Sequence, residues 1–220
     1  MEKKGIDFAA IPQTALKVLT SPSSFFREMP RTGGFVEPLV FLVAMGLVSG
    51  ALQTLFSIFR LHMVAGMAMG MASIIMTPIV VGIFGFVSAG ILFIIWKIMG
   101  SNEEYETAYR CMAYMGALSP ITAVLGLIPY VGFSLGLVLA TYYLVIASVE
   151  VHAIPMQKAR LVFGIIAAVS IMISVSSEIA TRRMARNMEN AAESWKNAAE
   201  QAQKAAETMQ KQMQQLPPPK

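Results

Sequence analysis

The chain has 220 residues, of which 55% are hydrophobic and 14% are charged, and its net charge is +4. Soluble domains are nearer a quarter charged, so this composition is typical of a protein solvated by lipid and excludes a separate soluble enzyme domain. The modest net charge disfavours nucleic acid as a partner, and the single cysteine, Cys111, excludes an internal disulfide and a thiolate metal cluster.

Four long intervals of the chain contain no Asp, Glu, Lys or Arg. A hydrocarbon core about 30 Å thick takes roughly 20 helical residues to cross, and it penalises any ionised side chain held at its centre. The intervals are long enough for at least five crossings. We therefore expect an all-α, polytopic membrane helical bundle with five transmembrane helices, located in the cell (inner) membrane. The charge-free intervals are residues 38–59, 61–96, 111–149 and 161–177.

Residues 1–34 precede the first charge-free interval and form an amphipathic N-terminal segment. Pro12 and the Ser21-Pro22 pair are helix-start signals, which predict two short helices. Phe25 and Phe26 stand beside basic residues, a pattern that fits a helix lying in the headgroup layer. A surface helix packed on the bundle is equally consistent with the pattern.

The first span is expected at residues 38–59, where Gly46 and Gly50 form a GxxxG pair that lets another helix approach closely. The next interval is harder to divide, because a reversal within two or three residues around Arg60 is too tight for a second full crossing there. We therefore expect residues 61–76 to form an interfacial or partly inserted helix that bends at Thr77-Pro78.

The second span follows this bend at residues 78–99, with Trp96 and Lys97 in the aromatic belt at the membrane interface. The third is expected to be broken at Ser119-Pro120, and the fourth begins with a second close-packing pair, Gly132 and Gly136. The last three spans are placed at residues 107–128, 131–149 and 161–179.

Residues 181–220 follow the five-span domain of residues 35–180 and are rich in Ala, Glu, Gln and Lys. We expect them to form a polar helix that ends before the proline run of residues 217–219. Its apolar positions alternate steps of four and three residues, which is a heptad stripe. The stripe allows self-association as a coiled coil, and a single helix on the membrane surface is equally consistent with it. The positions expected to carry self-association are Met188, Trp195, Ala202 and Met209.

Five spans place the two termini on opposite faces of the membrane. Nine lysines and arginines then fall on the N-terminal face and four lie near the membrane on the other, so the positive-inside bias predicts a cytoplasmic N-terminus. A sixth crossing within residues 61–77 would move the C-terminal helix to the same side as the N-terminus.

The sequence offers little catalytic chemistry. His62 and His152 are the only histidines, neither has a neighbour at metal-ligand spacing, and no HExxH or CxxC motif occurs. The span interiors carry no ionisable group of the kind that membrane enzymes and most transporters use. We expect no catalytic residues, no metal site and no cofactor.

Residues 105–163 contain a series of short elements: Tyr-Met-Gly-Ala-Leu-Ser-Pro from Tyr114, Ile-Pro-Tyr-Val-Gly from Ile128, Tyr-Tyr-Leu from Tyr142 and His-Ala-Ile-Pro from His152. In this order, and with Ser21-Pro22 and Phe25-Phe26 upstream, the chain resembles a bacterial-type member of the Yip domain family, the Ypt/Rab-GTPase-interacting proteins. The positions that fit the family pattern are Tyr114, Pro120, Pro129, Gly132, Tyr143 and His152.

The resemblance implies five spans, a cytoplasmic N-terminus and no catalytic activity. The Asp-Leu-Tyr-Gly-Pro element of the eukaryotic branch is missing, with residues 34–38 its nearest counterpart, so a small GTPase is not the expected partner. We expect a non-enzymatic scaffold or protein-interaction module that contacts the lipid bilayer and forms a homo-oligomer or binds other membrane proteins. The alternative is a small-solute channel or transporter built around Pro120 and the serines of the fifth span.

Overall fold

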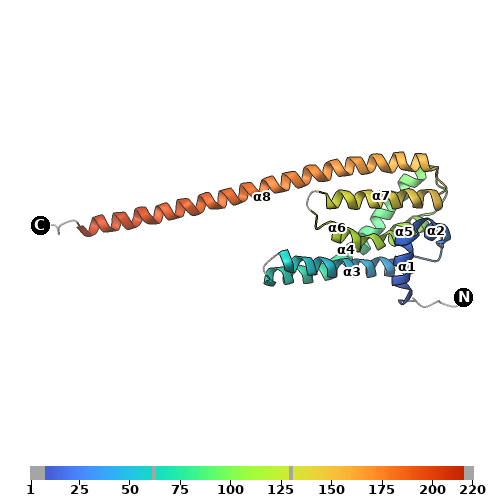
Figure 1. Cartoon of the computed structure of the whole chain (residues 1–220), viewed down its shortest axis with the longest axis horizontal. Coiled ribbons are helices and arrows are strands. Elements are labelled where there is room, and N and C mark those ends of the chain that lie inside the picture. The colour runs from blue at the N-terminus through green and yellow to red at the C-terminus, as the bar shows by residue number, and fades with distance from the viewer. Residues whose placement is uncertain (1–7, 61–62, 129–130, 216–220) are drawn as a thin grey trace. The chain divides into compact units, whose positions relative to one another are not determined.

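The computed structural model describes residues 8–60, 63–128 and 131–215, in which all the regular secondary structure is helical, without strands (Figure 1). The helices are α1 (Ala10–Thr20), α2 (Pro22–Glu28), α3 (Val36–Arg60), α4 (Met63–Ile98), α5 (Tyr105–Met115), the 3-10 helix η1 (Gly116–Leu118), α6 (Ser119–Leu125), α7 (Gly132–Glu150) and α8 (Met156–Gln215).

The chain divides into two compact units, Met1–Met172 and Ile173–Lys220, and α8 runs from the first into the second. Four described helices are long and apolar enough to cross a membrane, namely Val36–Phe56, Ile79–Ile98, Gly132–Glu150 and Met156–Gln201. The protein is therefore an all-helical, multi-pass membrane protein. The expected count of five crossings stays a prediction.

The expectation for residues 61–76 is wrong in two respects. These residues are not a separate helix, because α4 is helical without interruption from Met63 to Ile98, and the bend expected at Thr77-Pro78 stays a prediction. A tight reversal is also feasible, since α3 ends at Arg60, α4 begins at Met63 and the two helices pack against each other. Proline has no amide proton, so one carbonyl oxygen in the preceding turn loses its helical hydrogen bond. Proline is tolerated within membrane helices because neighbouring groups donate a hydrogen bond to that oxygen instead.

The expected break of the third apolar segment is present. The α-helix α5 ends at Met115, the 3-10 turn η1 follows, and α6 starts at Ser119 with Pro120 in its first turn. Proline lacks the amide proton that would continue the helical ladder, so the chain restarts a helix at this residue. None of these three pieces is by itself long enough to span a bilayer.

Leu42 of α3 joins three elements in the core of the first unit. Its side chain is 1% exposed and lies between Gly85 of α4 and Gly116 of η1. A Cβ atom built on either glycine would come within 2.7 Å of a terminal methyl carbon of Leu42. The two glycines therefore provide the space that lets α3 pack closely against both neighbours.

Gly132 lies at the start of α7, where the chain returns from α6. A Cβ atom there would lie 1.8 Å from the carbonyl oxygen of Leu125, while one on Gly136 would lie 3.3 Å from Cγ2 of Thr122. The contact at Gly132 is with backbone, which cannot rotate away as a side chain can. Only glycine therefore fits at position 132. At position 136 the Thr122 side chain could shift slightly to accept a Cβ atom.

We expect Gly132→Ala to lower the free energy of unfolding by about 1–3 kcal/mol or more, the usual cost of inserting an atom into closely packed structure. Gly164→Ala is the matched control, because nothing lies within 4 Å of a Cβ atom at that helical glycine. The thermal midpoint of each variant in mild detergent measures the effect. Equal midpoints for the two variants would contradict the packing described for α6 and α7.

Candidate functional site

One end of the first unit collects the polar groups, and we call it the polar end. It consists of the N-terminal residues 8–35 and the loops of residues 99–104 and 151–155, which adjoin the ends of α4 and α7 and the starts of α5 and α8 (Figure 1). Because α3 starts and α4 ends here, the two loops and the N-terminal segment meet at one face of the bundle.

The two N-terminal helices pack on the bundle through apolar side chains. Val18 of α1 and Phe25 and Phe26 of α2 are buried, and Phe25 lies edge to face with Tyr114 of α5 at 5.1 Å. The helix α1 contacts α5 and η1, while α2 contacts α7. Of the two alternatives for Phe25 and Phe26, packing on the bundle is the one that the structure shows.

Polar contacts fix these helices to α7. The Arg27 guanidinium donates to both carboxylate oxygens of Glu150, with Nε–Oε2 and Nη2–Oε1 distances of 2.9 and 3.0 Å. The Tyr143 hydroxyl donates to the carbonyl oxygen of Leu19 at 3.0 Å. The carboxylate of Glu150 raises the pKa of Arg27 by hydrogen bonding and by its charge. A bidentate pair of this kind adds geometric specificity to the contact.

The segment between α2 and α3 is held by α5. The amide nitrogen of Gly34 donates to Oε1 of Glu106 at 2.6 Å, and Nη1 of Arg110 donates to the carbonyl oxygen of Gly34 at 2.9 Å. Arg31 pairs with Glu103, and the hydroxyl of Thr107 donates to the carbonyl oxygen of Arg31. Gly33 and Gly34 both have positive φ angles, which glycine adopts without strain.

His152 is the centre of a buried polar and aromatic cluster between the two loops. Its Nδ1 atom lies 2.7 Å from the hydroxyl of Ser101, and its ring stacks on Trp96 with 3.9 Å between centroids. The Trp96 indole donates to the hydroxyl of Ser148 at 2.8 Å. Burial lowers the pKa of His152 to about 4, and the charges of Arg31 and Lys97 act in the same direction. The imidazole is therefore neutral at physiological pH.

The interface position expected for Trp96 is wrong. Trp96 is 0% exposed, so its ring belongs to the core of the polar end and faces neither lipid nor water. Its stacking on His152 and its hydrogen bond to Ser148 together explain why an aromatic residue near a helix end is buried.

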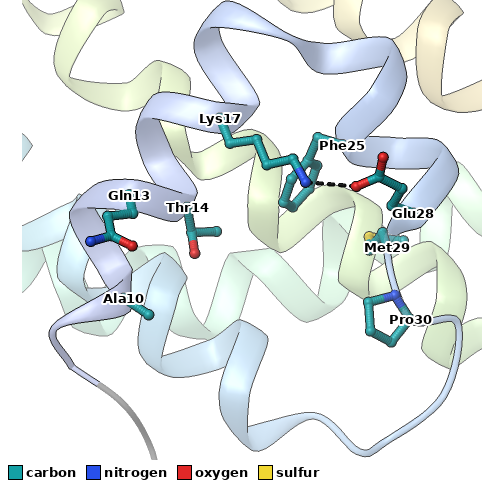
Figure 2. A pocket seen from close by; sticks show the side chains of 8 residues that line it. All are labelled: Ala10, Gln13, Thr14, Lys17, Phe25, Glu28, Met29 and Pro30. Carbon is teal, nitrogen blue, oxygen red and sulfur yellow. Dashed lines mark hydrogen bonds and ion pairs between the residues drawn. The ribbon is translucent and has the colours of Figure 1, made fainter.

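A shallow groove of about 350 Å³ separates α1 from α2 at the surface of the polar end. Figure 2 shows Gln13 and Thr14 along α1, Phe25 and Met29 toward its floor, and the Lys17–Glu28 ion pair across it. The ion pair has an Nζ–Oε2 distance of 2.6 Å, and hydrogen bonding to Lys17 lowers the pKa of Glu28. The groove thus offers one cation, one anion and an apolar floor.

The Ser101–His152 pair has the separation of a nucleophile and its general base, but its surroundings favour a structural role. Both residues are buried, and the Ser101 hydroxyl also accepts a hydrogen bond from the amide of Glu103 at 3.2 Å. A catalytic pair needs access for a substrate at the reacting oxygen. Among the residues that the structure describes, no three His, Cys, Asp or Glu side chains come together as metal ligands.

The family-pattern residues fall into two groups. Tyr114, Tyr143 and His152 are buried in and beneath the polar end, where each contacts another element. Pro120 and Gly132 belong to the region of α6 and the start of α7, and Pro129 lies outside the described residues.

The predicted packing positions are less uniform. Gly46 and Gly50 are buried in α3, and Gly136 faces Thr122 of α6. Met188 and Trp195 are exposed on α8, while the side chains of Ala202 and Met209 lie outside those that the structure describes. The roles assigned to these positions in self-association stay predictions.

Sequence reasoning missed several residues that build the polar end. Arg110 is 1% exposed although its side chain ends in a guanidinium group, and Ser101 and Ser148 are buried partners of His152 and Trp96. One signal could have found Arg110: it is the last basic residue before a long charge-free interval.

The depressed pKa of His152 makes the stability of the protein depend on pH. The unfolded chain takes up the proton below about pH 6.5, whereas the folded chain takes it up only near pH 4, so stability is full above pH 6.5 and falls as the pH drops between these values. The loss amounts to roughly 3 kcal/mol. Thermal midpoints in detergent from about pH 7 to about pH 4.5 should fall more steeply for the wild type than for His152→Gln. Parallel pH profiles of the two proteins would show that His152 does not cause the loss.

Comparison with known proteins gives one match. The Yip1 domain profile matches residues 16–177, which run from α1 into α8 and include the polar end from residue 16 onward. No curated protein and no solved structure matches the chain. Because the match covers well over half of the 220 residues, and the described helices form a multi-pass membrane bundle, the chain belongs to the Yip1 domain family.

Proposed function

We propose that this protein is a non-enzymatic membrane scaffold that self-associates through its C-terminal helix and offers its polar end to partner proteins. The observation that carries the proposal is an exposed apolar stripe on the second unit. Met184, Met188 and Trp195 are 66%, 64% and 76% exposed and follow the heptad spacing of a coiled-coil seam. Large apolar side chains in such a row mark an interaction surface.

The residues beside the stripe favour a close helix–helix contact. The triplet Ala-Ala-Glu repeats every seven residues from Ala191, Ala198 and Ala205, so small side chains flank the seam in each heptad. If Met188 and Trp195 occupy the a positions, the flanking e and g positions from residue 192 to 201 are Ala192, Ser194, Ala199 and Gln201, all uncharged. Glu193, Lys196 and Glu200 then lie on the outer face, where they keep the helix soluble.

The polar end is the part of the first unit suited to recognition by other proteins. Its fold is fixed by buried contacts, which reduces the entropy lost when a partner binds. The groove between α1 and α2 presents Lys17, Glu28 and an apolar floor at its surface. The counterpart of the GTPase-branch element, residues 34–38, is engaged by Glu106 and Arg110, and this supports a partner other than a small GTPase.

Self-association is tested with a double substitution on the stripe of the full-length protein. We expect light scattering in mild detergent to find an oligomer for the wild type and a monomer for Met188→Glu with Trp195→Glu, which places two charges on the seam. Asn190→Glu with Asn197→Glu is the matched control, since both asparagines are exposed, have the same spacing and lie off the seam. Its oligomeric state should equal that of the wild type.

Two results would contradict the scaffold proposal. An unchanged oligomer in the Met188 and Trp195 double variant would show that the stripe is not the interface. Solute flux through reconstituted vesicles that is lost on replacing Pro120 would instead support a small-solute channel or transporter.

We further infer a cytoplasmic polar end and an inner-membrane location from the distribution of basic residues. The opposite turns, residues 57–63 and 125–132, contain one lysine or arginine, Arg60. The polar end and its flanks contain Lys17, Arg27, Arg31, Lys97, Arg110, Lys158 and Arg160. A cysteine placed at Asn102 should react with a membrane-impermeant maleimide only after the cells are opened, and labelling of intact cells would reverse the assigned orientation.

A further inference from the structure

An apolar groove runs between α3 and α4 in the membrane-spanning part of the first unit. It has a volume of about 460 Å³, and its lining atoms are all apolar. The side chains that form it are Leu39 and Val43 of α3 and Ile79, Ile83 and Phe86 of α4, with Gly82 between them. From Ile79 to Phe86 the groove follows α4 for about 10 Å, at 1.5 Å per residue.

Glycine keeps this groove open. Gly82 has no side chain to fill the space, and a Cβ atom there would lie 3.9 Å from Leu39, an ordinary contact. A larger side chain at Gly82 could therefore project into the groove without displacing backbone. At Gly85, in contrast, Leu42 already occupies the position that a Cβ atom would take, so the packing of the two helices requires glycine there. The packing does not require glycine at Gly82 in this way.

The medium facing the groove is the hydrocarbon of the bilayer. Both lining helices are long and apolar enough to span the membrane, within Val36–Phe56 and Ile79–Ile98. Ile79 and Ile83 at the edge of the groove are 51% and 62% exposed, as expected for side chains in contact with lipid. Water would gain no hydrogen bond from an all-apolar lining, so a flexible hydrocarbon chain is the occupant that fits.

The polar groups of the site lie at one end of the groove only. Leu39 is two residues, about 3 Å along the axis, from Glu37 in the first turn of α3, and the Glu37 carboxylate is largely exposed. Phe86 closes this end by stacking on Tyr109 at 4.3 Å and packing against Phe35 at 6.0 Å. An amphiphile in the groove would therefore have its polar part beside Glu37 and its chain directed toward Val43.

A cation also lies at this end. Arg110 contacts Oε2 of Glu37 at 3.5 Å, which is long for a charge-assisted hydrogen bond, and its Nε has no partner among the described residues. Arg110 is 1% exposed and also donates to the carbonyl oxygen of Gly34, so it is enclosed by the protein, and Glu37 is the charged group exposed at this end. A phospholipid, with a polar headgroup at one end and acyl chains at the other, matches a groove that has polar groups at one end only.

We propose that the groove between α3 and α4 is a binding site for one acyl chain of a bilayer phospholipid, with the headgroup at the level of Glu37 and Arg110. The site is separate from the C-terminal stripe, so it holds whether or not the protein self-associates. The lipid would fill the space between two helices and become part of the packed structure of the first unit.

The test uses the full-length protein in vesicles that contain a phosphatidylglycerol with a photoactivatable diazirine in one acyl chain. Illumination followed by mass spectrometry should label Val43 and Ile83 several-fold more strongly than Ile94, which is exposed on α4 but lies outside the groove. Gly82→Leu fills the groove and should lower labelling at Val43 and Ile83 to the level at Ile94.

Gly164→Leu adds the same side chain to a membrane-helix glycine with open space around it and should leave the labelling pattern unchanged. Unaltered labelling at Ile94 shows that Gly82→Leu is folded and inserted. Equal labelling of Val43, Ile83 and Ile94 in the wild type would overturn the proposal, because it would mean that the groove meets only exchanging bilayer lipid. Crosslinking between Val43→Cys residues of two chains would also overturn it, by making a second copy the occupant.

Discussion

The exclusion of charge from hydrocarbon is the constraint on which the rest of this structure depends. An ionised side chain at the bilayer centre is costly, so the charged residues of the first unit gather where its helices end. These charged side chains then need ion-pair or hydrogen-bond partners in a closely packed region with limited access to water. Arg27 pairs with Glu150, Glu106 binds the amide of Gly34, and Arg110 donates to the carbonyl of the same glycine.

These pairings turn the N-terminal segment into part of the bundle. Phe25 and Phe26 supply buried apolar area, whereas the polar contacts determine the position at which that area docks. Inside the bundle, glycines have the equivalent role. Gly85 and Gly116 receive Leu42, and Gly132 admits the carbonyl of Leu125. Specificity thus comes from hydrogen bonds at the polar end and from shape in the membrane.

Periodicity and charge predicted the helices well, because the lipid requirement leaves a direct trace in the sequence. The first, second and fourth spans match α3, the C-terminal part of α4 and α7, and the break before Pro120 is confirmed. Continuity through Pro78 was not predictable from local preference, since neighbouring groups in a membrane helix offset the loss of one hydrogen bond.

The site was less accessible to sequence reasoning than the fold. His152 fitted the family pattern, but its partners Ser101 and Trp96 come from a loop and a helix about fifty residues earlier, and no local pattern links them. Trp96 has the sequence position of an interface residue, and only its tertiary contacts show that it is buried. The packing glycines Gly85 and Gly116 stand outside any GxxxG pair, so the motif directed attention to Gly46 and Gly50 instead.

Together these features describe a bundle of membrane helices with an ordered polar end. Its N-terminal helices are an integral part of the fold, and this is the central claim of the account. Hydrogen–deuterium exchange of the full-length protein in lipid nanodiscs tests it most directly. The backbone amides of α1 and α2 should exchange as slowly as those of α5 and α7, on which α1 and α2 respectively pack. Exchange of α1 and α2 as fast as that of an exposed, unpacked peptide would contradict it.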